Sequence, residues 1–146
     1  MKFFFGFLFL LLTTLTQRVA AQSALAGDTL KSVEIIKADR LQIRKSDNAE
    51  VQILAGNVQL RQGTTLFSCD SCIINNQTKI FEAFGRVHIN DDTTNIYANY
   101  LKYLSVPQLA NLRGTVKLTD GHGTLTTNEL DYDVAHKIGT YNNGGR

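Results

Sequence analysis

The residue types best suited to chemistry are two cysteines, Cys69 and Cys72, spaced as Cys-x-x-Cys. Such a pair can form a local disulfide, act as a redox centre or supply half of a zinc site. Structural zinc needs two further ligands, and the sequence holds no second Cys-x-x-Cys and no closely spaced histidine pair. We therefore interpret the cysteines first as small buried thiols. A local disulfide is the main alternative, and metal or redox chemistry is the third.

The three histidines do not form a catalytic arrangement. His88 alternates with Val87 and Ile89, which places it on the outer face of a strand, whereas His122 and His136 stand among turn residues. None has a serine or cysteine at a recognised nucleophile spacing. We expect all three to be solvated surface side chains.

Two acidic groups, Asp91-Asp92 and Asp131-x-Asp133, present clustered oxygens of the kind that calcium binds. Both groups fall in predicted turns, and neither has the frame of an EF-hand or a calcium repeat, so a turn-forming role is the simpler interpretation. An enzyme acting on polysaccharides would need a convincing carboxylate pair, which the sequence lacks. We expect no catalytic residue, no metal and no cofactor.

Two sequence patterns repeat along the chain with a common period of about 29 residues. The form Gly-x-Val-x-(Leu/Ile) begins at three evenly spaced glycines: Gly56, Gly85 and Gly114. A second pattern has Asp or Asn in its second place and begins at Ala38, Cys69, Ala98 and Thr127, at the same interval except for a slightly longer first one. Such a repeat is the signature of a stacked architecture in which each unit contacts its neighbours.

Each unit of about 29 residues indicates two strands and two turns, because apolar and polar residues alternate with a period of two. In the second strand of one unit, Ile96 and Ala98 share a phase, while Leu101 and Tyr103 share the opposite one. Keeping all four on one face needs a slip of one residue at Asn99. We predict a β-bulge there, which the Asp or Asn found at this place in every copy suits.

A glycine stands in the middle of the other strand of each unit, where a long strand can bend sharply. A strand of about ten residues spans roughly 33 Å, which is long for a compact sandwich, so we expect the strands to fold over on themselves. The predicted fold class is all-β: an antiparallel repeat of two-strand units with an open groove between two facing sheets. The apolar groove would be lined by Leu54, Val58, Leu60, Phe81, Val87, Ile89, Leu112, Val116 and Leu118.

Residues 1–21 have the order of a secretory signal peptide: the basic Lys2, an apolar run and small residues up to Ala21. The run from Phe3 to Leu15 is shorter than the roughly 20 residues of a membrane-spanning helix. We therefore expect residues 1–21 to be cleaved, with an uncleaved anchor as the alternative, and the product to be exported to an oxidising compartment.

The remainder would be a linker at 22–30 and one domain at 31–146. Its last residues, 141–146, are similar to the segment around Gly85 and stop where the next Val of the repeat would stand. We expect the domain to be truncated there and the natural product to be longer. Without Lys2 and Arg18, the 15 basic residues become 13 against 13 acidic ones, which argues against nucleic acid as a partner.

The alternation of Gly-x-Val-x-Leu with Ala-Asp-x-Leu-x-(Ile/Tyr) behind a signal peptide resembles the OstA-like (LptA) family of lipopolysaccharide transport, over about residues 31–146. The resemblance implies a β-jellyroll, open along one side, whose interior shields lipopolysaccharide acyl chains in the periplasm. It also implies two kinds of partner: lipopolysaccharide or a related glycolipid, and other β-jellyroll proteins that stack edge to edge, self-association included. The sequence departs from the pattern at Cys69 and Cys72, where other copies have Ala or Thr and Leu.

Our first functional interpretation is a non-enzymatic periplasmic module that binds or passes acyl chains along the apolar groove towards the outer membrane. The second strands would add four residues to the lining: Ile96, Leu101, Leu125 and Leu130. The alternative is a structural β-solenoid, such as an adhesin or stalk, in which the same apolar positions meet across a dry core and bind nothing. The interior volume would discriminate between the two.

Overall fold

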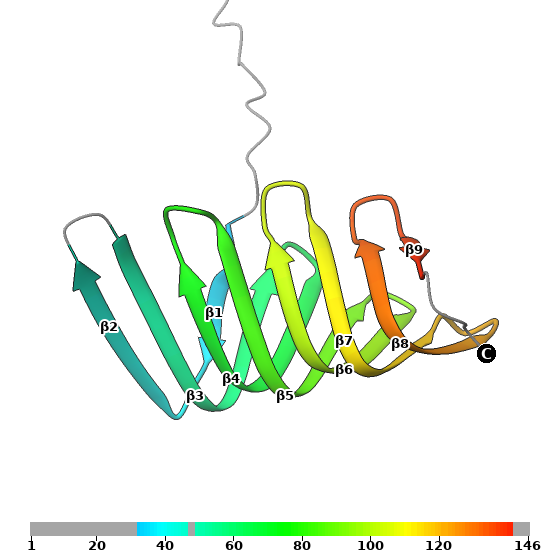
Figure 1. The fold of residues 1–146 in the computed structure, drawn as a ribbon, viewed down its shortest axis with the longest axis horizontal. Coiled ribbons are helices and arrows are strands. Elements are labelled where there is room, and N and C mark those ends of the chain that lie inside the picture. The colour runs from blue at the N-terminus through cyan, green and yellow to red at the C-terminus, as the bar shows by residue number, and fades with distance from the viewer. Residues whose placement is uncertain (1–31, 47–48, 142–146) are drawn as a thin grey trace, which may run out of the picture.

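The computed structural model describes residues 32–46 and 49–141 (Figure 1). These residues form β1 (Glu34–Lys37), β2 (Arg40–Ser46), β3 (Ala49–Gln62), β4 (Thr65–Asn75), β5 (Ile80–Asp91), β6 (Thr94–Leu104), β7 (Leu109–Thr119), β8 (Thr124–Asp133) and β9 (Ile138–Thr140). No helix in this part of the chain has the length and hydropathy that a membrane span requires. The expected signal peptide at 1–21 and linker at 22–30 lie outside the described residues, as does the chain end at 142–146.

The described strands form one antiparallel sheet in the order β1-β3-β4-β5-β6-β7-β8-β9, with β2 also paired to β3. β2 pairs with the first half of β3 and β1 with the second half, so β1 and β2 together take the place of one bent strand. From β3 onward, each strand pairs with the next one along the chain. The predicted antiparallel all-β repeat is confirmed.

The long strands bend at the repeated glycines. In the β5–β6 pair, Gly85 and Arg86 together lie opposite Asn99, so the register shifts by one residue. Both have left-handed backbone, with φ of 73° and 44°. The same left-handed pairs begin at Gly56 and Gly114. Because the bends line up from strand to strand, the sheet folds over into two facing arms (Figure 1).

We call these halves of the sheet the front arm and the rear arm. The front arm contains β2, the first half of β3, β9 and the strand halves joined by the turns 76–79, 105–108 and 134–137. The rear arm contains β1 and the strand halves joined by the turns 63–64, 92–93 and 120–123. The apolar inner faces meet between the arms. The bend closes one long side of this interior, and we call the opposite side, where the turns lie, the rim.

The predicted slip at Asn99 is confirmed, with one correction. Ile96, Ala98, Leu101 and Tyr103 are all buried in the one core, and the register shifts beside Asn99. The extra residue of the bulge, however, belongs to the glycine strand and not to the strand that carries Asp or Asn. Two left-handed residues there oppose a single residue of the neighbouring strand.

An acidic or amide side chain from the neighbouring segment of the preceding unit covers each of these glycines. A Cβ at Gly85 would overlap the carboxylate of Asp70, and one at Gly56 would lie 2.5 Å from Oδ2 of Asp39. Arg86, the second residue of its bulge, donates from Nε to Oδ1 of Asp70 at 2.8 Å. The bend therefore requires glycine for two reasons: the left-handed φ and the close approach of the neighbouring side chain.

We predict that Gly85→Ala lowers the free energy of unfolding by about 2 kcal/mol or more, since alanine is strained at positive φ and its Cβ meets Asp70. Gly123→Ala is the matched control, because nothing lies within 4 Å of its Cβ position. Its effect should stay within about 0.5 kcal/mol. Urea unfolding followed by circular dichroism measures both variants, and equal losses would contradict this account of the bend.

Candidate functional site

Every predicted groove residue lies on the inner face of the arms. Leu118 and Leu125 are partly buried and pack against the core. The others belong to one buried cluster: Leu54, Val58, Leu60, Phe81, Val87, Ile89, Ile96, Leu101, Leu112, Val116 and Leu130. The structure thus brings the whole set together, and lipid binding by these residues stays a prediction.

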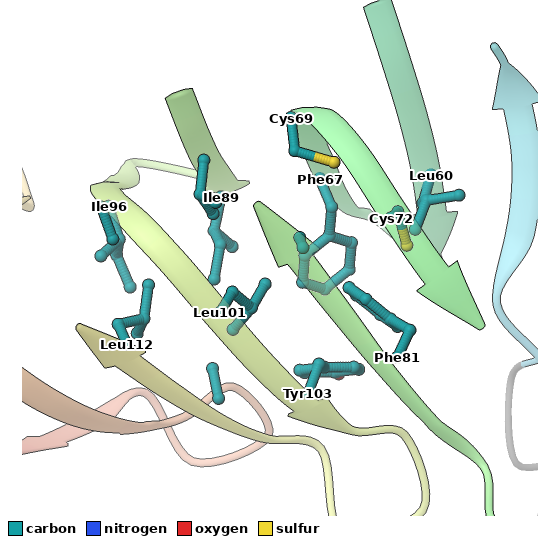
Figure 2. Packing of buried hydrophobic residues seen from close by; sticks show 14 of the residues in the cluster. Leu60, Phe67, Cys69, Cys72, Phe81, Ile89, Ile96, Leu101, Tyr103 and Leu112 are labelled. Atoms are coloured by element: carbon teal, nitrogen blue, oxygen red, sulfur yellow. The ribbon is translucent and has the colours of Figure 1, made fainter. Parts of the chain in front are cut away.

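An aromatic cluster fills the middle of this interior, and of its three residues the sequence analysis placed only Phe81 in the groove lining. The rings of Phe67, Phe81 and Tyr103 pack with their centroids 4.8 to 5.2 Å apart (Figure 2). The side chains here are packed against one another, and as a result Phe81 is 1% exposed and Tyr103 is 0% exposed. The signal for Phe67 was available, since it stands two residues before Cys69 and so shares its face of the strand.

The interior is open at its N-terminal end, where β2 forms the edge of the front arm. Leu41 occupies the repeat position of Cys72 and Leu101 and pairs in register with Leu54. Leu41 is 52% exposed, whereas Cys72 and Leu101 are 0% exposed. Ile43, two residues further on, is also exposed. The apolar inner face therefore continues into solvent at this end.

Polar side chains join the two arms along the rim. The hydroxyl of Tyr103 in the front arm donates to Oε1 of Gln62, the last residue of β3 in the rear arm, at 2.5 Å. Nε2 of Gln62 in turn donates to the carbonyl of Ser105 at 3.1 Å. Gln62 is buried, and burial raises the pKa of Tyr103, so its hydroxyl stays protonated as a donor at neutral pH.

The next repeat carries Asp91 and Tyr132 at the same two rim positions, one period further along. Both side chains are buried, and the Thr65 hydroxyl donates to Oδ1 of Asp91 at 3.3 Å. Within the described chain, Oδ2 of Asp91 has no hydrogen-bond partner. Burial raises the pKa of Tyr132, a hydrogen bond with Thr94 offsets part of this rise, and the negative charge of Asp91 adds to it. The buried polar atoms at this rim position therefore have fewer hydrogen bonds than those at Gln62.

The acidic groups that were predicted in turns are placed differently. Asp91 is the last residue of β5, Asp133 is the last residue of β8, and Asp131 lies inside β8, where Asn111 donates to it at 2.7 Å. Of the four, Asp92 lies in a turn. In residues 32–46 and 49–141, no three His, Cys, Asp or Glu side chains group together as a metal site requires. The burial of Asp91 was missed because its rim position depends on the second arm.

The histidines lie where the sequence predicts. His88 is on the outer face, where its ring stacks on Tyr97 with centroids 4.4 Å apart and Nε2 lies 2.9 Å from Oδ1 of Asn95. His122 and His136 are exposed in turns. All three are on the outside of the arms or in turns, away from the apolar interior.

Both cysteines are buried free thiols on the inner face, at the positions that Ala98 and Leu101 occupy in the next unit. A hydrogen bond between the two sulfurs lowers the pKa of Cys69 and raises the pKa of Cys72. Burial also raises the pKa of Cys72. The pair therefore packs as part of the core.

Comparison with known proteins places this bent sheet in a family. The model of the OstA-like protein family matches residues 30–146. The chain belongs to the OstA-like family. No curated protein matches the OstA-like sequence.

A solved structure similar to this OstA-like chain is that of LptH from Pseudomonas aeruginosa, described as the LptA homologous periplasmic component of the conserved lipopolysaccharide transport device. The sequence identity is 16%, the TM-score is 0.65, and the match covers 78% of this chain and 84% of the LptH chain. The likeness confirms the predicted β-jellyroll fold.

For this OstA-like chain, we predict that a maleimide adds to neither Cys69 nor Cys72 in the native protein, because both thiols are buried. Two additions should follow unfolding without reductant, and the variant Cys69→Ala should then show one. Intact-mass spectrometry counts the additions. Failure to label the unfolded, unreduced wild type would establish a disulfide instead.

Proposed function

We propose that this OstA-like protein is a non-enzymatic module that carries or passes lipopolysaccharide acyl chains through the periplasm. The observation that carries the proposal is the continuous apolar inner face, which is buried in the middle of the stack and exposed on β2. LptH, a protein of the same fold, is described as a component of lipopolysaccharide transport, which supports the same substrate class.

Desolvation supplies the driving force of this mechanism. When an acyl chain covers Leu41 and Ile43 at the open end, its transfer out of water is favourable by about 0.8 kcal/mol of free energy per buried methylene. The sugar headgroup, with its charges, stays in solvent outside the arms, because burying an unpaired charge costs several kcal/mol. A ligand can therefore move along the inner face while its headgroup remains hydrated.

The filled middle of the interior sets a condition on this movement. Ile89, Ile96 and Leu101 are fully buried, so an acyl chain that passes them must displace side chains or separate the arms. At the bend the arms are joined by the backbone itself. At the rim they are joined by side-chain hydrogen bonds such as that from Tyr103 to Gln62. We therefore infer that the arms separate at the rim.

A structural β-solenoid is the second candidate, and the filled interior is the observation that favours it. The contacts among Phe67, Phe81 and Tyr103 are those of a dry core. The exposed inner face at β2 and the likeness to LptH favour lipid handling. Direct measurement of lipopolysaccharide binding decides between the two.

The same open end offers a surface for a protein partner. In the described part of the chain β2 pairs with β3 alone, so its other edge presents unpaired backbone groups. We infer that another β-jellyroll, or a second copy of this chain, adds a strand to this edge. Such an addition continues both the sheet and the apolar inner face.

We predict that Leu118→Asn and Leu125→Asn each weaken lipopolysaccharide binding about tenfold, since an amide on the inner face opposes burial of acyl chains. Both leucines are partly buried, so these variants perturb the fold less than a substitution at Val116 would. Lys117→Asn and Thr126→Asn, their outward neighbours, are matched controls that should change binding by less than about twofold. Isothermal titration with purified lipopolysaccharide measures all four.

Circular dichroism and melting temperature, recorded for each variant, separate lost binding from lost folding. Photo-crosslinking gives a second readout, in which a probe at position 118 should label lipopolysaccharide and a probe at 117 should not. A folded wild type that binds no lipopolysaccharide, or that crosslinks from 117 but never from 118, would transfer the assignment to the structural solenoid.

We predict that the wild type associates with increasing concentration through β2. The double variant Leu41→Lys and Ile43→Lys should remain monomeric at the same concentrations, because charges on an edge strand oppose pairing. Arg40→Gln and Gln42→Lys, on the alternate face of the same strand, form the control. Sedimentation velocity across a wide concentration range measures the effect, and a wild type that stays monomeric throughout would argue against the edge.

A further inference from the structure

Rim positions repeat along the chain, so equivalent contacts can be compared directly. Gln62 and Tyr103 meet across the rim, and one period later the buried Asp91 and Tyr132 occupy the equivalent positions. One period before Tyr103 stands Ile74, and the residue that directly precedes β1 is Val33; both are apolar and line one pocket. The first rim register is therefore apolar, and no side-chain hydrogen bond can form between its two residues.

A pocket of about 150 Å³ lies at this first register. Its apolar lining comes from both sides of the rim, with Val33 next to β1 and Ile74, Ile80 and Val106 in the front arm. Ile74 belongs to the buried core, so the pocket borders the interior. An apolar cavity of about 150 Å³ can hold a benzene-sized group, which matches the tip of an acyl chain.

The polar part of the lining places a positive charge at the mouth of the pocket. The side chain of Asn75 accepts hydrogen bonds from two backbone N–H groups of the turn that ends at Lys79, both at 3.0 Å. The carbonyl of Lys79 accepts from the backbone N–H of Ser105 at 2.9 Å, and the carbonyl of Ser105 accepts from Gln62. Lys79 is exposed and lines the pocket, so its ammonium group is within reach of an anionic group bound there.

We propose that this pocket is a lateral port for the tip of one acyl chain whose lipid carries an anionic group, with Lys79 pairing with that group. The inference rests on the proposed function, and it adds where an acyl chain binds and that its lipid carries an anionic group. Gln62 forms the wall between the port and the interior, since it lines the pocket and is bonded to Tyr103 and Ser105. A chain in the port therefore reaches the core when this wall moves.

The test uses the full chain and cis-parinaric acid, a fluorescent fatty acid, with its methyl ester as the uncharged probe. Val106→Asp puts a carboxylate in the lining at a residue that is 49% exposed, and it should weaken binding of both probes about tenfold. Ala135→Asp, at the same turn position one period later and outside the pocket lining, is the matched control and should change binding by less than about twofold.

A second substitution tests the charge. Lys79→Gln installs the residue found one period later at Gln108, so it suits the turn. It should weaken binding of the acid about threefold and leave binding of the ester unchanged. Equal losses for the acid and the ester would overturn the assigned role of Lys79.

Competition distinguishes the two sources of an anionic acyl chain. Displacement of the probe by lipid A at lower concentration than by palmitate assigns the port to a phosphorylated glycolipid, and the reverse order assigns it to free fatty acid. Both outcomes support the port. Equal effects of Val106→Asp and Ala135→Asp, with Leu118→Asn still lowering probe binding, would overturn the port and leave the proposed function standing. A wild type that binds neither probe would overturn both.

Discussion

Two consecutive left-handed residues in each glycine strand are the constraint on which the rest of the structure depends. On a flat sheet the apolar face of these strands would lie in water. The bulge at Gly85 and its equivalents turns each strand back, so that two halves of one strand face each other. Because Asp70 and Asn99 lie directly over Gly85 and Gly114, a larger residue cannot take the glycine position without displacing its neighbour. The apolar core depends on these corners as much as on the apolar residues themselves.

Stability and the proposed lipid handling place opposite demands on the interior. A filled core holds the arms together, whereas an acyl chain needs space between them. The two demands are compatible because contacts between side chains and contacts between side chain and acyl chain are of the same kind, dispersion in the absence of water. The rim bonds, including those of Gln62, contribute about 1 kcal/mol each, far less than the backbone ladder of the sheet. The polar links between the arms at the rim are therefore weaker than the continuous backbone that joins them at the bend.

Period and phase are one-dimensional properties, so the sequence predicted the repeat, the inner-face residues and the slip at Asn99. It could not predict which strand holds the extra bulge residue, because a glycine and an Asn both stand at the bend and the choice depends on pairing in three dimensions. It also missed the contact of Gln62 with Tyr103, which lie 41 residues apart and so in different units. In the sequence Asp91 resembles a turn residue, and its burial could not be predicted because that burial depends on the front arm.

The strand order has a consequence for how the chain folds. From β3 to β9, each strand pairs with its sequence neighbours, so every pairing closes a short loop and the contact order is low for a β protein. Each new hairpin covers the apolar inner face of the previous one and presents its own. Because synthesis starts at the N-terminus, the chain can therefore fold one hairpin at a time as it is made. In the described part of the chain no later hairpin covers the free edges of β1 and β2, and folding of these strands alone leaves both edges without a partner.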